Sequence, residues 1–178
     1  MSCRALQSGR ATLCKESVGG IKNVYFINQG DVNSTKITLS GAGEKLISGF
    51  TSDTNIYKYE AVGFASSYEE SNEVSRENGT SFFTQTLNLI IHNQDAAASR
   101  ELSALSKTSP AAIVEDTNGK FLLIGLDNGL DVSVASTTGT ALGDMNGYTL
   151  TATGVEPEMA YFVEPTIIGD STNTTIVL

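Results

Sequence analysis

The fold class is decided by the segment Ala112-Ile-Val-Glu-Asp-Thr-Asn-Gly-Lys-Phe-Leu-Leu-Ile124, in which two apolar runs flank Asn118-Gly119. Asn-Gly accommodates the positive φ angles of a two-residue β-turn, and the β-branched and aromatic residues around it favour extended strands. The segment therefore predicts a β-hairpin. Asn128-Gly129 and Asn146-Gly147 repeat the turn signal further along the chain. Strands are predicted near these turns at 130–134, 148–153 and 159–163, so the second half of the chain has the pattern of a β-meander.

The first half of the chain carries the same signal. Runs of β-branched and aromatic residues stop at clusters of Gly, Asn, Asp or Ser, which is the pattern of strands followed by turns. The predicted strands are 21–27, 36–39, 55–64 and 82–91. Together with the meander, these runs predict a mainly β fold.

A polar, acidic segment, Ala65-Ser-Ser-Tyr-Glu-Glu-Ser-Asn-Glu-Val-Ser-Arg-Glu-Asn-Gly-Thr-Ser81, separates two of these strands. Because it lies between 55–64 and 82–91, it predicts a hairpin with a long projecting loop. Loops longer than about 12–15 residues are uncommon unless they are functional or disordered. We therefore expect the loop 65–81 to be functional.

One segment, 95–107, has the pattern of a helix. Asp95 occupies the N-cap position, where a side-chain oxygen accepts a hydrogen bond from a free backbone N–H. Leu102 and Leu105 are spaced to share one face, and Pro110 prevents the helix from continuing. With only two leucines, this helix is predicted to cover a sheet rather than to join a helical bundle.

Chain length and composition fit one domain with two terminal arms. The chain has 178 residues, of which 40% are hydrophobic, and this is enough for one sizeable core. Residues 1–20 and 164–178 are polar, so they are predicted to be arms around a β domain that spans 21–163. The apolar end Thr174-Thr-Ile-Val-Leu178 is suited to adding a strand to a neighbouring sheet edge.

Charged residues make up only 17% of the chain, and Ser, Thr, Asn and Gly take their place. A neutral polar surface suits a protein that packs against copies of itself, because charges are costly to bury. The formal net charge of −9 repels phosphate groups and argues against tight nucleic-acid binding. Residues 1–60 hold seven basic and five acidic residues (+2), and residues 61–178 hold four and fifteen (−11). Either this difference in charge attracts neighbouring copies to each other, or the charged residues simply lie on solvent-exposed faces.

The sequence predicts a protein made in the cytoplasm. The first twenty residues contain no apolar run of the kind that a signal peptide needs. No stretch approaches the roughly 18 apolar residues of a membrane span. Cys3 and Cys14 are too few for a disulfide-stapled secreted domain and have no nearby histidine for a zinc site, so both are expected to be free thiols.

A search for catalytic groups finds no motif. His92 is the only histidine, and no Gly-x-Ser-x-Gly elbow accompanies it. Asp127, Asp131 and Asp144 offer oxygen ligands, but their spacing is not that of an EF-hand. We therefore predict no enzyme activity, no catalytic residue, no metal site and no cofactor.

Two segments, Gly119-Lys-Phe-Leu-Leu-Ile-Gly-Leu-Asp-Asn-Gly-Leu-Asp-Val132 and Thr138-Gly-Thr-Ala-Leu-Gly-Asp-Met-Asn-Gly-Tyr-Thr-Leu-Thr-Ala-Thr-Gly-Val-Glu-Pro157, resemble virion proteins of tailed phages of Bacteroidetes-type hosts. In those chains a Gly-Leu-x-Val strand, a Gly-Thr-Ala-x-Gly-Asp turn and an Asn-Gly-Tyr-Thr-Leu strand recur near the C-terminus. The order of a long-loop hairpin followed directly by a helix is similar to that of the tail tube proteins of tailed bacteriophages.

This resemblance implies two packed antiparallel sheets, forming a sandwich or partial barrel, with one short flanking α-helix. It also implies hexameric rings of identical subunits, which stack into a tube through the long loop and the terminal arms. The loop residues expected at the contact between rings are Tyr68, Glu69, Glu70, Glu73, Arg76 and Glu77.

The resemblance further implies that genomic DNA moves through the channel of the tube without specific binding, because an acidic wall repels phosphates. The candidate acids on that wall are Glu60, Glu115, Asp116, Asp127 and Asp131. Strand alternation lets only about half of them face inward. The implied partners are copies of the chain and other tail proteins, with no membrane. The implied location is the virion tail, after synthesis in the cytoplasm of the host bacterium.

Other classes of protein fit part of the sequence. A tail terminator, a tail adaptor or the tube protein of an injection system has a related fold. A β-sandwich adhesin would share the Thr and Asn content but would need a signal peptide. A small β-rich hydrolase would need a motif around His92.

Overall fold

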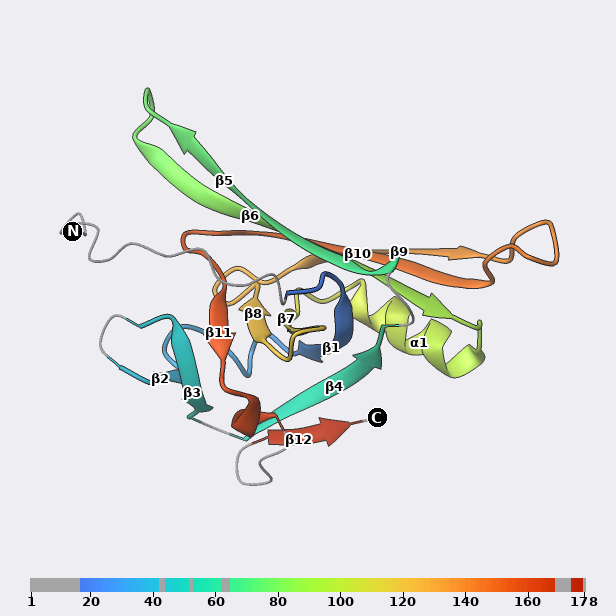
Figure 1. Ribbon diagram of the computed structural model, residues 1–178, viewed down its shortest axis with the longest axis horizontal. Coiled ribbons are helices and arrows are strands. Elements are labelled where there is room, and N and C mark those ends of the chain that lie inside the picture. The colour runs from blue at the N-terminus through green and yellow to red at the C-terminus, as the bar shows by residue number, and fades with distance from the viewer. Residues whose placement is uncertain (1–16, 42–43, 52, 62–64, 169–173, 178) are drawn as a thin grey trace.

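The computed structural model describes residues 17–41, 44–51, 53–61, 65–168 and 174–177, which form two β-sheets, one α-helix and a short 3-10 helix, Pro165–Ile167 (Figure 1). The large sheet has eight strands and the small sheet has four. The predicted fold class, mainly β with two packed sheets and one short flanking helix, is confirmed.

In spatial order the large sheet contains β12 (Thr174–Val177), β4 (Thr54–Glu60), β1 (Ile21–Ile27), β7 (Ala111–Asp116), β8 (Phe121–Ile124), β11 (Tyr161–Val163), β3 (Leu46–Phe50) and β2 (Ile37–Leu39). The small sheet contains β5 (Ser67–Ser75), β6 (Thr80–His92), β10 (Gly147–Glu156) and β9 (Asp131–Thr137). Two pairs, β12–β4 and β11–β3, are parallel rather than antiparallel as expected. Both join strands that are far apart in the sequence, which no tight turn connects.

The hairpin predicted at 112–124 is confirmed as β7 and β8, but its turn contains three residues, 117–119, where two were expected. Ala112 pairs with Ile124 and Glu115 with Phe121, and Gly119 in the turn has a φ of 74°. The Asp116 carboxylate accepts a hydrogen bond from the backbone N–H of Lys120 at 2.7 Å, which closes the turn. The turn chemistry therefore sets the register of the strands at the centre of the large sheet.

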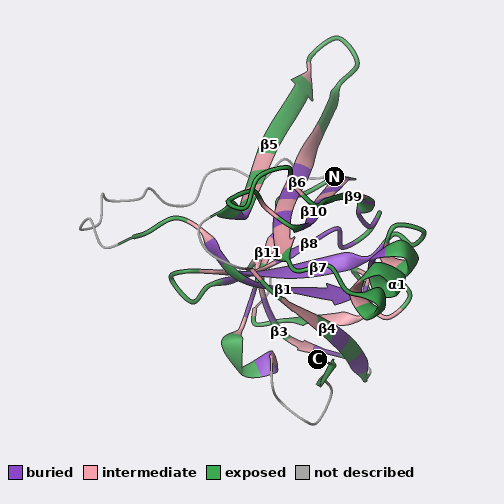
Figure 2. Ribbon diagram, turned by 90° about the vertical axis from the view of Figure 1, so that its right-hand side faces the viewer, coloured by how far each residue is buried: buried purple, intermediate pink, exposed green. Residues whose placement is uncertain are grey.

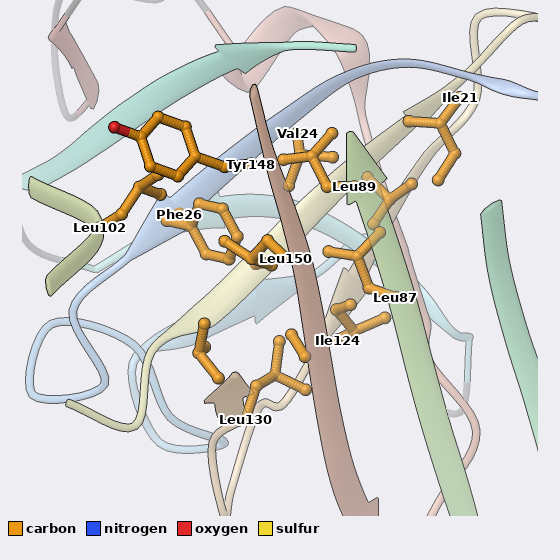
Figure 3. Close-up of a cluster of buried hydrophobic side chains, with 14 of the residues drawn as sticks. Ile21, Val24, Phe26, Leu87, Leu89, Leu102, Ile124, Leu130, Tyr148 and Leu150 are labelled. Carbon is orange, nitrogen blue, oxygen red and sulfur yellow. The ribbon is translucent and has the colours of Figure 1, made fainter. Parts of the chain in front are cut away.

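The main hydrophobic core lies between the two sheets and the helix α1 (Ala96–Leu105) (Figure 3). The large sheet contributes Val24 and Phe26, the small sheet contributes Leu89 and Leu150, and all four side chains are buried. Burying each such side chain stabilises the fold by about 1.5–3 kcal/mol. Because alternate residues of each strand point to this core, the register of each sheet is fixed by its apolar face.

A second hydrophobic core packs on the opposite face of the large sheet. Ile56 of β4 and Ile47 of β3 belong to the same buried cluster, although these strands lie near opposite edges of the sheet. The sheet must therefore curl around this cluster. Its two edge strands, β12 and β2, remain separate, so the curl does not close.

The predicted helix is confirmed with slightly shorter bounds. Asp95 is the N-cap, and its carboxylate accepts a hydrogen bond from the backbone N–H of Ala98 at 2.6 Å. Leu102 is buried and Leu105 packs against the main core, so the helix covers the core as expected.

The prediction of a long loop at 65–81 is wrong. Residues 67–75 are strand β5, which pairs with β6 from Ser67↔Asn88 to Ser75↔Thr80, and only 76–79 form a turn. The expected partner strand was also wrong, because β4 belongs to the large sheet. β5 has few apolar side chains, so it shows no clear hydrophobic alternation and its partner β6 determines its conformation. The strand β3 was not predicted from the sequence.

The terminal arms are described only in part. The backbone N–H of Val18 donates to Asn118 Oδ1 at 3.0 Å, which places the end of the N-terminal arm beside the β7–β8 turn. Cys3 and Cys14 lie outside the described residues. At the other end, β12 pairs with β4 of its own chain, whereas the sequence suggested a neighbouring edge.

Candidate functional site

The hairpin of β5 and β6 projects beyond the rest of the domain (Figure 1). β10 covers β6 only from Phe83 to His92, so the outer end of the hairpin has two strands. The described residues from Ser71 to Ser81 are all exposed except the half-buried Ser75, as Figure 2 shows. In the turn, Gly79 has a φ of 63°, and the backbone N–H of Asn78 donates to Ser75 Oγ at 3.3 Å. The expected functional loop is thus a projecting, ordered hairpin.

The residues predicted to contact the next ring divide into two groups. Glu69, Glu73, Arg76 and Glu77 are exposed on the hairpin. Tyr68 and Glu70 instead point toward the protein, because even-numbered residues of β5 share the face of Leu87 and Gln85 on β6. The Tyr68 ring packs against the main core, and its buried hydroxyl has no hydrogen-bond partner among the described residues. Burial and the nearby Glu70 charge raise the pKa of this hydroxyl. Both side chains are half-buried at the base of the hairpin, away from its exposed outer end.

A chain of hydrogen bonds anchors the base of the hairpin to the large sheet. Glu70 Oε1 accepts from Gln85 Nε2 and from the backbone N–H of Ala160, both at 2.9 Å. Gln85 is buried, and its Oε1 accepts from the backbone N–H of Gly125 at 2.9 Å. Since Gly125 and Ala160 adjoin β8 and β11, the hairpin leaves the domain from a fixed base.

The outer face of the small sheet is polar and carries only negative charge. One row across the four strands reads Glu69, Thr86, Thr153 and Asp131, and the next reads Ser67, Asn88, Thr151 and Ser133. Hydrogen bonds connect neighbouring strands on this face, such as Thr151 Oγ1 to Asn88 Oδ1 at 3.0 Å. None of the residues in β5, β6, β9 and β10 is Lys or Arg. We call this surface the threonine face.

The five candidate channel acids do not share one surface. Asp131 lies on the threonine face. Glu60 lies on the large sheet, where a hydrogen bond from Lys58 at 2.7 Å lowers the pKa of its carboxyl group. Asp116 closes the β7–β8 turn, and Asp127 accepts a hydrogen bond from the backbone N–H of Ser34 at 3.2 Å. The sequence did not place Glu69 and Glu73 on the same face as Asp131, because that requires the pairing of β5 with β6.

Glu115 was expected to face solvent on the channel wall, and this prediction is wrong. The residue is buried, with an exposed fraction of only 6%. Its carboxylate accepts hydrogen bonds from Asn23 Nδ2 at 2.6 Å and from the Tyr25 hydroxyl at 3.1 Å, and it pairs with Lys22 at 3.1 Å. Burial alone raises the pKa of Glu115, but these hydrogen bonds and the Lys22 charge together bring it below its ordinary value. Burial and the Glu115 charge raise the pKa of Tyr25 to about 12. Glu115 therefore joins β7 to β1 and is a structural residue.

We expect Glu115→Ala to lower the free energy of unfolding by about 3 kcal/mol, because it leaves buried donors of Asn23 and Tyr25 without a partner. Since the folded pKa lies below the ordinary value of 4.5, the ionised group stabilises the protein above that pH, and this contribution disappears as the pH falls through the folded pKa. Denaturant unfolding at a series of pH values between roughly 3 and 7 measures both effects. Asp131→Ala is the matched control, because Asp131 is an exposed carboxylate on a strand. An equal loss in both variants would contradict the role of Glu115.

Glu156 is a buried carboxylate that the sequence did not single out. Its Oε1 accepts hydrogen bonds from the backbone N–H groups of Asp127 at 3.1 Å and Asn128 at 2.9 Å. Burial raises the pKa of Glu156, although these hydrogen bonds oppose the effect. The carboxylate holds the 127–129 turn against the end of β10, so its role is structural.

His92 and the possible metal ligands are the remaining candidate residues. His92 is exposed at the end of β6. Among the residues that the structure describes, no three His, Cys, Asp or Glu side chains are grouped so as to hold a metal ion. No helix in the same part of the chain is long and apolar enough to cross a membrane. Comparison of the chain with protein-family models, curated proteins and solved structures finds no match.

Proposed function

We propose that this chain is the subunit of a bacteriophage tail tube, with copies arranged in hexameric rings that stack to form a channel for DNA. In this proposal the threonine face lines the channel, and the β5–β6 hairpin contacts the next ring. The subunit acts in the virion tail with other tail proteins and catalyses no reaction.

The observation that carries the proposal is the charge of the threonine face. Glu69, Glu73 and Asp131 supply its charges, the four strands contain no Lys or Arg, and the rest of the face is mainly hydroxyl and amide groups. A surface of this kind repels phosphate, and it offers DNA no cationic group that would retain it. DNA can therefore slide along such a wall.

The projecting hairpin supports the stacking of rings. Its outer end is exposed and polar apart from Val74, whose exposed fraction is 68%. The base of the hairpin is fixed by Glu70 and Gln85, so its outer end has a defined direction. A contact made by a fixed projection on a different surface of the next copy is heterologous, and repeated contacts of this kind build filaments.

We expect purified full-length protein to form rings or tubes at high protein concentration. Negative-stain electron microscopy and sedimentation velocity measure this assembly. Exposed acids on a channel wall repel each other within about 8–10 Å, and salt screens that repulsion, so moderate salt should not dissolve the tubes. A strictly monomeric protein at every concentration, without rings or tubes, would overturn the proposed function.

A further inference from the structure

The loop between β9 and β10, residues 138–146, presents a fully exposed leucine, Leu142. Ala141 and Gly143 flank it, so no large neighbouring side chain in the sequence shields it. The loop lies at the right-hand end of the molecule in Figure 1, away from both sheets' cores. A single exposed leucine is not unusual by itself. The loop that carries Leu142 is, in addition, held in one conformation by its own hydrogen bonds.

The 138–146 loop is ordered by one carboxylate. Asp144 Oδ2 accepts hydrogen bonds from the backbone N–H groups of Thr140 and Ala141, both at 2.8 Å, and from Thr140 Oγ1 at 3.1 Å. Gly139 has a φ of 67°, and a Cβ atom there would lie 2.3 Å from Asp144 Cβ. Because the loop is already ordered, burying Leu142 against a partner loses little conformational entropy.

A hollow of about 290 Å³ lies far from this loop, among residues of β3, β8 and β11 and the segment after β11. Its lining is mainly apolar and includes Leu46, Phe162 and Pro165. The exposed fraction of Phe162 is 43%, which is high for an aromatic side chain on a large sheet. We call this feature the Phe162 hollow.

The charge of the 138–146 loop and its position in the fold both favour the Phe162 hollow of another copy as its binding site. Asp144 is the only charged residue of the 138–146 loop, and Lys120 is the only charged residue that lines the hollow. The Lys120 ammonium makes no ion pair with any residue that the structure describes. The groove beside α1 is the competing site, but it is lined by Glu101, which would repel the loop. In Figure 1, β3 and β11 lie to the left of the centre and the loop lies at the far right, so one copy cannot fill its own hollow.

We propose that Leu142 of one copy inserts into the Phe162 hollow of a second copy, with Lys120 facing the acidic loop. This proposal rests on the proposed function, since it names the contact between neighbouring subunits of a ring. The contact joins two different surfaces, and it closes into a ring when the rotation between copies allows closure. The hairpin is then left free for the contact between rings.

Cross-linking tests the contact directly. The variant carries Cys3→Ser and Cys14→Ser with two new cysteines, Gly143→Cys beside the leucine and Thr166→Cys beside the hollow. Both new positions are exposed, and a Cβ atom at Gly143 meets nothing within 4 Å. A short bismaleimide should produce a ladder of covalent oligomers. Each single-cysteine variant is the control, because one cysteine per chain allows dimers at most.

Substitution measures the strength of the contact. Leu142→Ser should weaken self-association by about tenfold or more in sedimentation, because it removes the buried side chain. Lys120→Glu should also weaken it, most strongly at low salt. Val155→Ser is the matched control, because Val155 is an exposed apolar residue that lies on the threonine face. It should assemble as the unmodified protein does.

The outcomes separate this contact from the proposed function. If the unmodified protein forms tubes but the double-cysteine variant gives no ladder, the contact is wrong and the tube function stands. A ladder from Gly143→Cys combined with Ala104→Cys, in the groove beside α1, in place of the expected one would overturn the choice of the hollow. A protein that never associates would overturn both proposals. Assembly of Leu142→Ser with unchanged affinity would also reject the contact.

Discussion

Shortening the β5–β6 hairpin is expected to abolish tube growth while leaving a folded subunit that still forms rings. The variant lacks Asn72–Ser75 and Thr80–Phe83 but keeps the turn 76–79. Ser71 then precedes the turn as Ser75 did, and Thr84 follows it as Thr80 did, since Ser71 and Thr84 are already paired. Removing four residues from each strand keeps every remaining side chain on its original face.

The cut must leave Tyr68 and Glu70 in place, because these residues pack on the core and anchor the hairpin. Circular dichroism and thermal unfolding check that the shortened protein is folded, and electron microscopy counts rings and tubes. A full-length variant with Glu73→Gln and Glu77→Gln is the control, because it removes charge but preserves the reach of the hairpin. Tubes of normal length from the folded, shortened protein would show that the hairpin does not connect the rings.

Placing lysines on the threonine face is expected to turn a surface that repels DNA into one that binds it. The variant combines Thr86→Lys, Thr149→Lys and Ser133→Lys, which lie on three strands and face the same side. None of the three hydroxyl groups makes a side-chain hydrogen bond with a described residue. In a ring the new charges converge on the channel, so rings should bind duplex DNA about tenfold more tightly than the control, with an affinity that falls as salt rises.

The control places three lysines at Ala97, Ser99 and Ser103, which are exposed on α1. Both variants change the net charge of each chain from −9 to −6, by three added positive charges, so only the position of the charge differs. Fluorescence anisotropy with a short duplex measures the affinity of assembled rings, and microscopy checks that both variants still assemble. Equal DNA binding by the two variants would show that the threonine face does not line the channel.

Several features of the protein follow from the sequence because they depend on neighbouring residues. Asn118-Gly119 predicted the β7–β8 hairpin, since the turn needs a positive φ that Gly119 adopts at 74°. Asp95 and the two leucines after it predicted the helix, because an N-cap and a shared apolar face depend only on residues within one or two helical turns. The mainly β class followed from repeated short apolar runs between turn residues.

The tertiary structure alone decided the candidate site, because burial depends on which strands become neighbours. Glu115 and Glu69 look alike in the sequence, yet the partners Asn23 and Tyr25 bury the first, and the position of β5 leaves the second exposed. The polar strand β5 has no apolar alternation of its own, so its pairing with β6 creates both the projecting hairpin and the row from Glu69 to Asp131. The sequence by itself determined the turns, the helix and the β class through local backbone preferences. The sheet that each strand joins, and therefore the face that carries each charge, was set by packing between residues far apart in the chain.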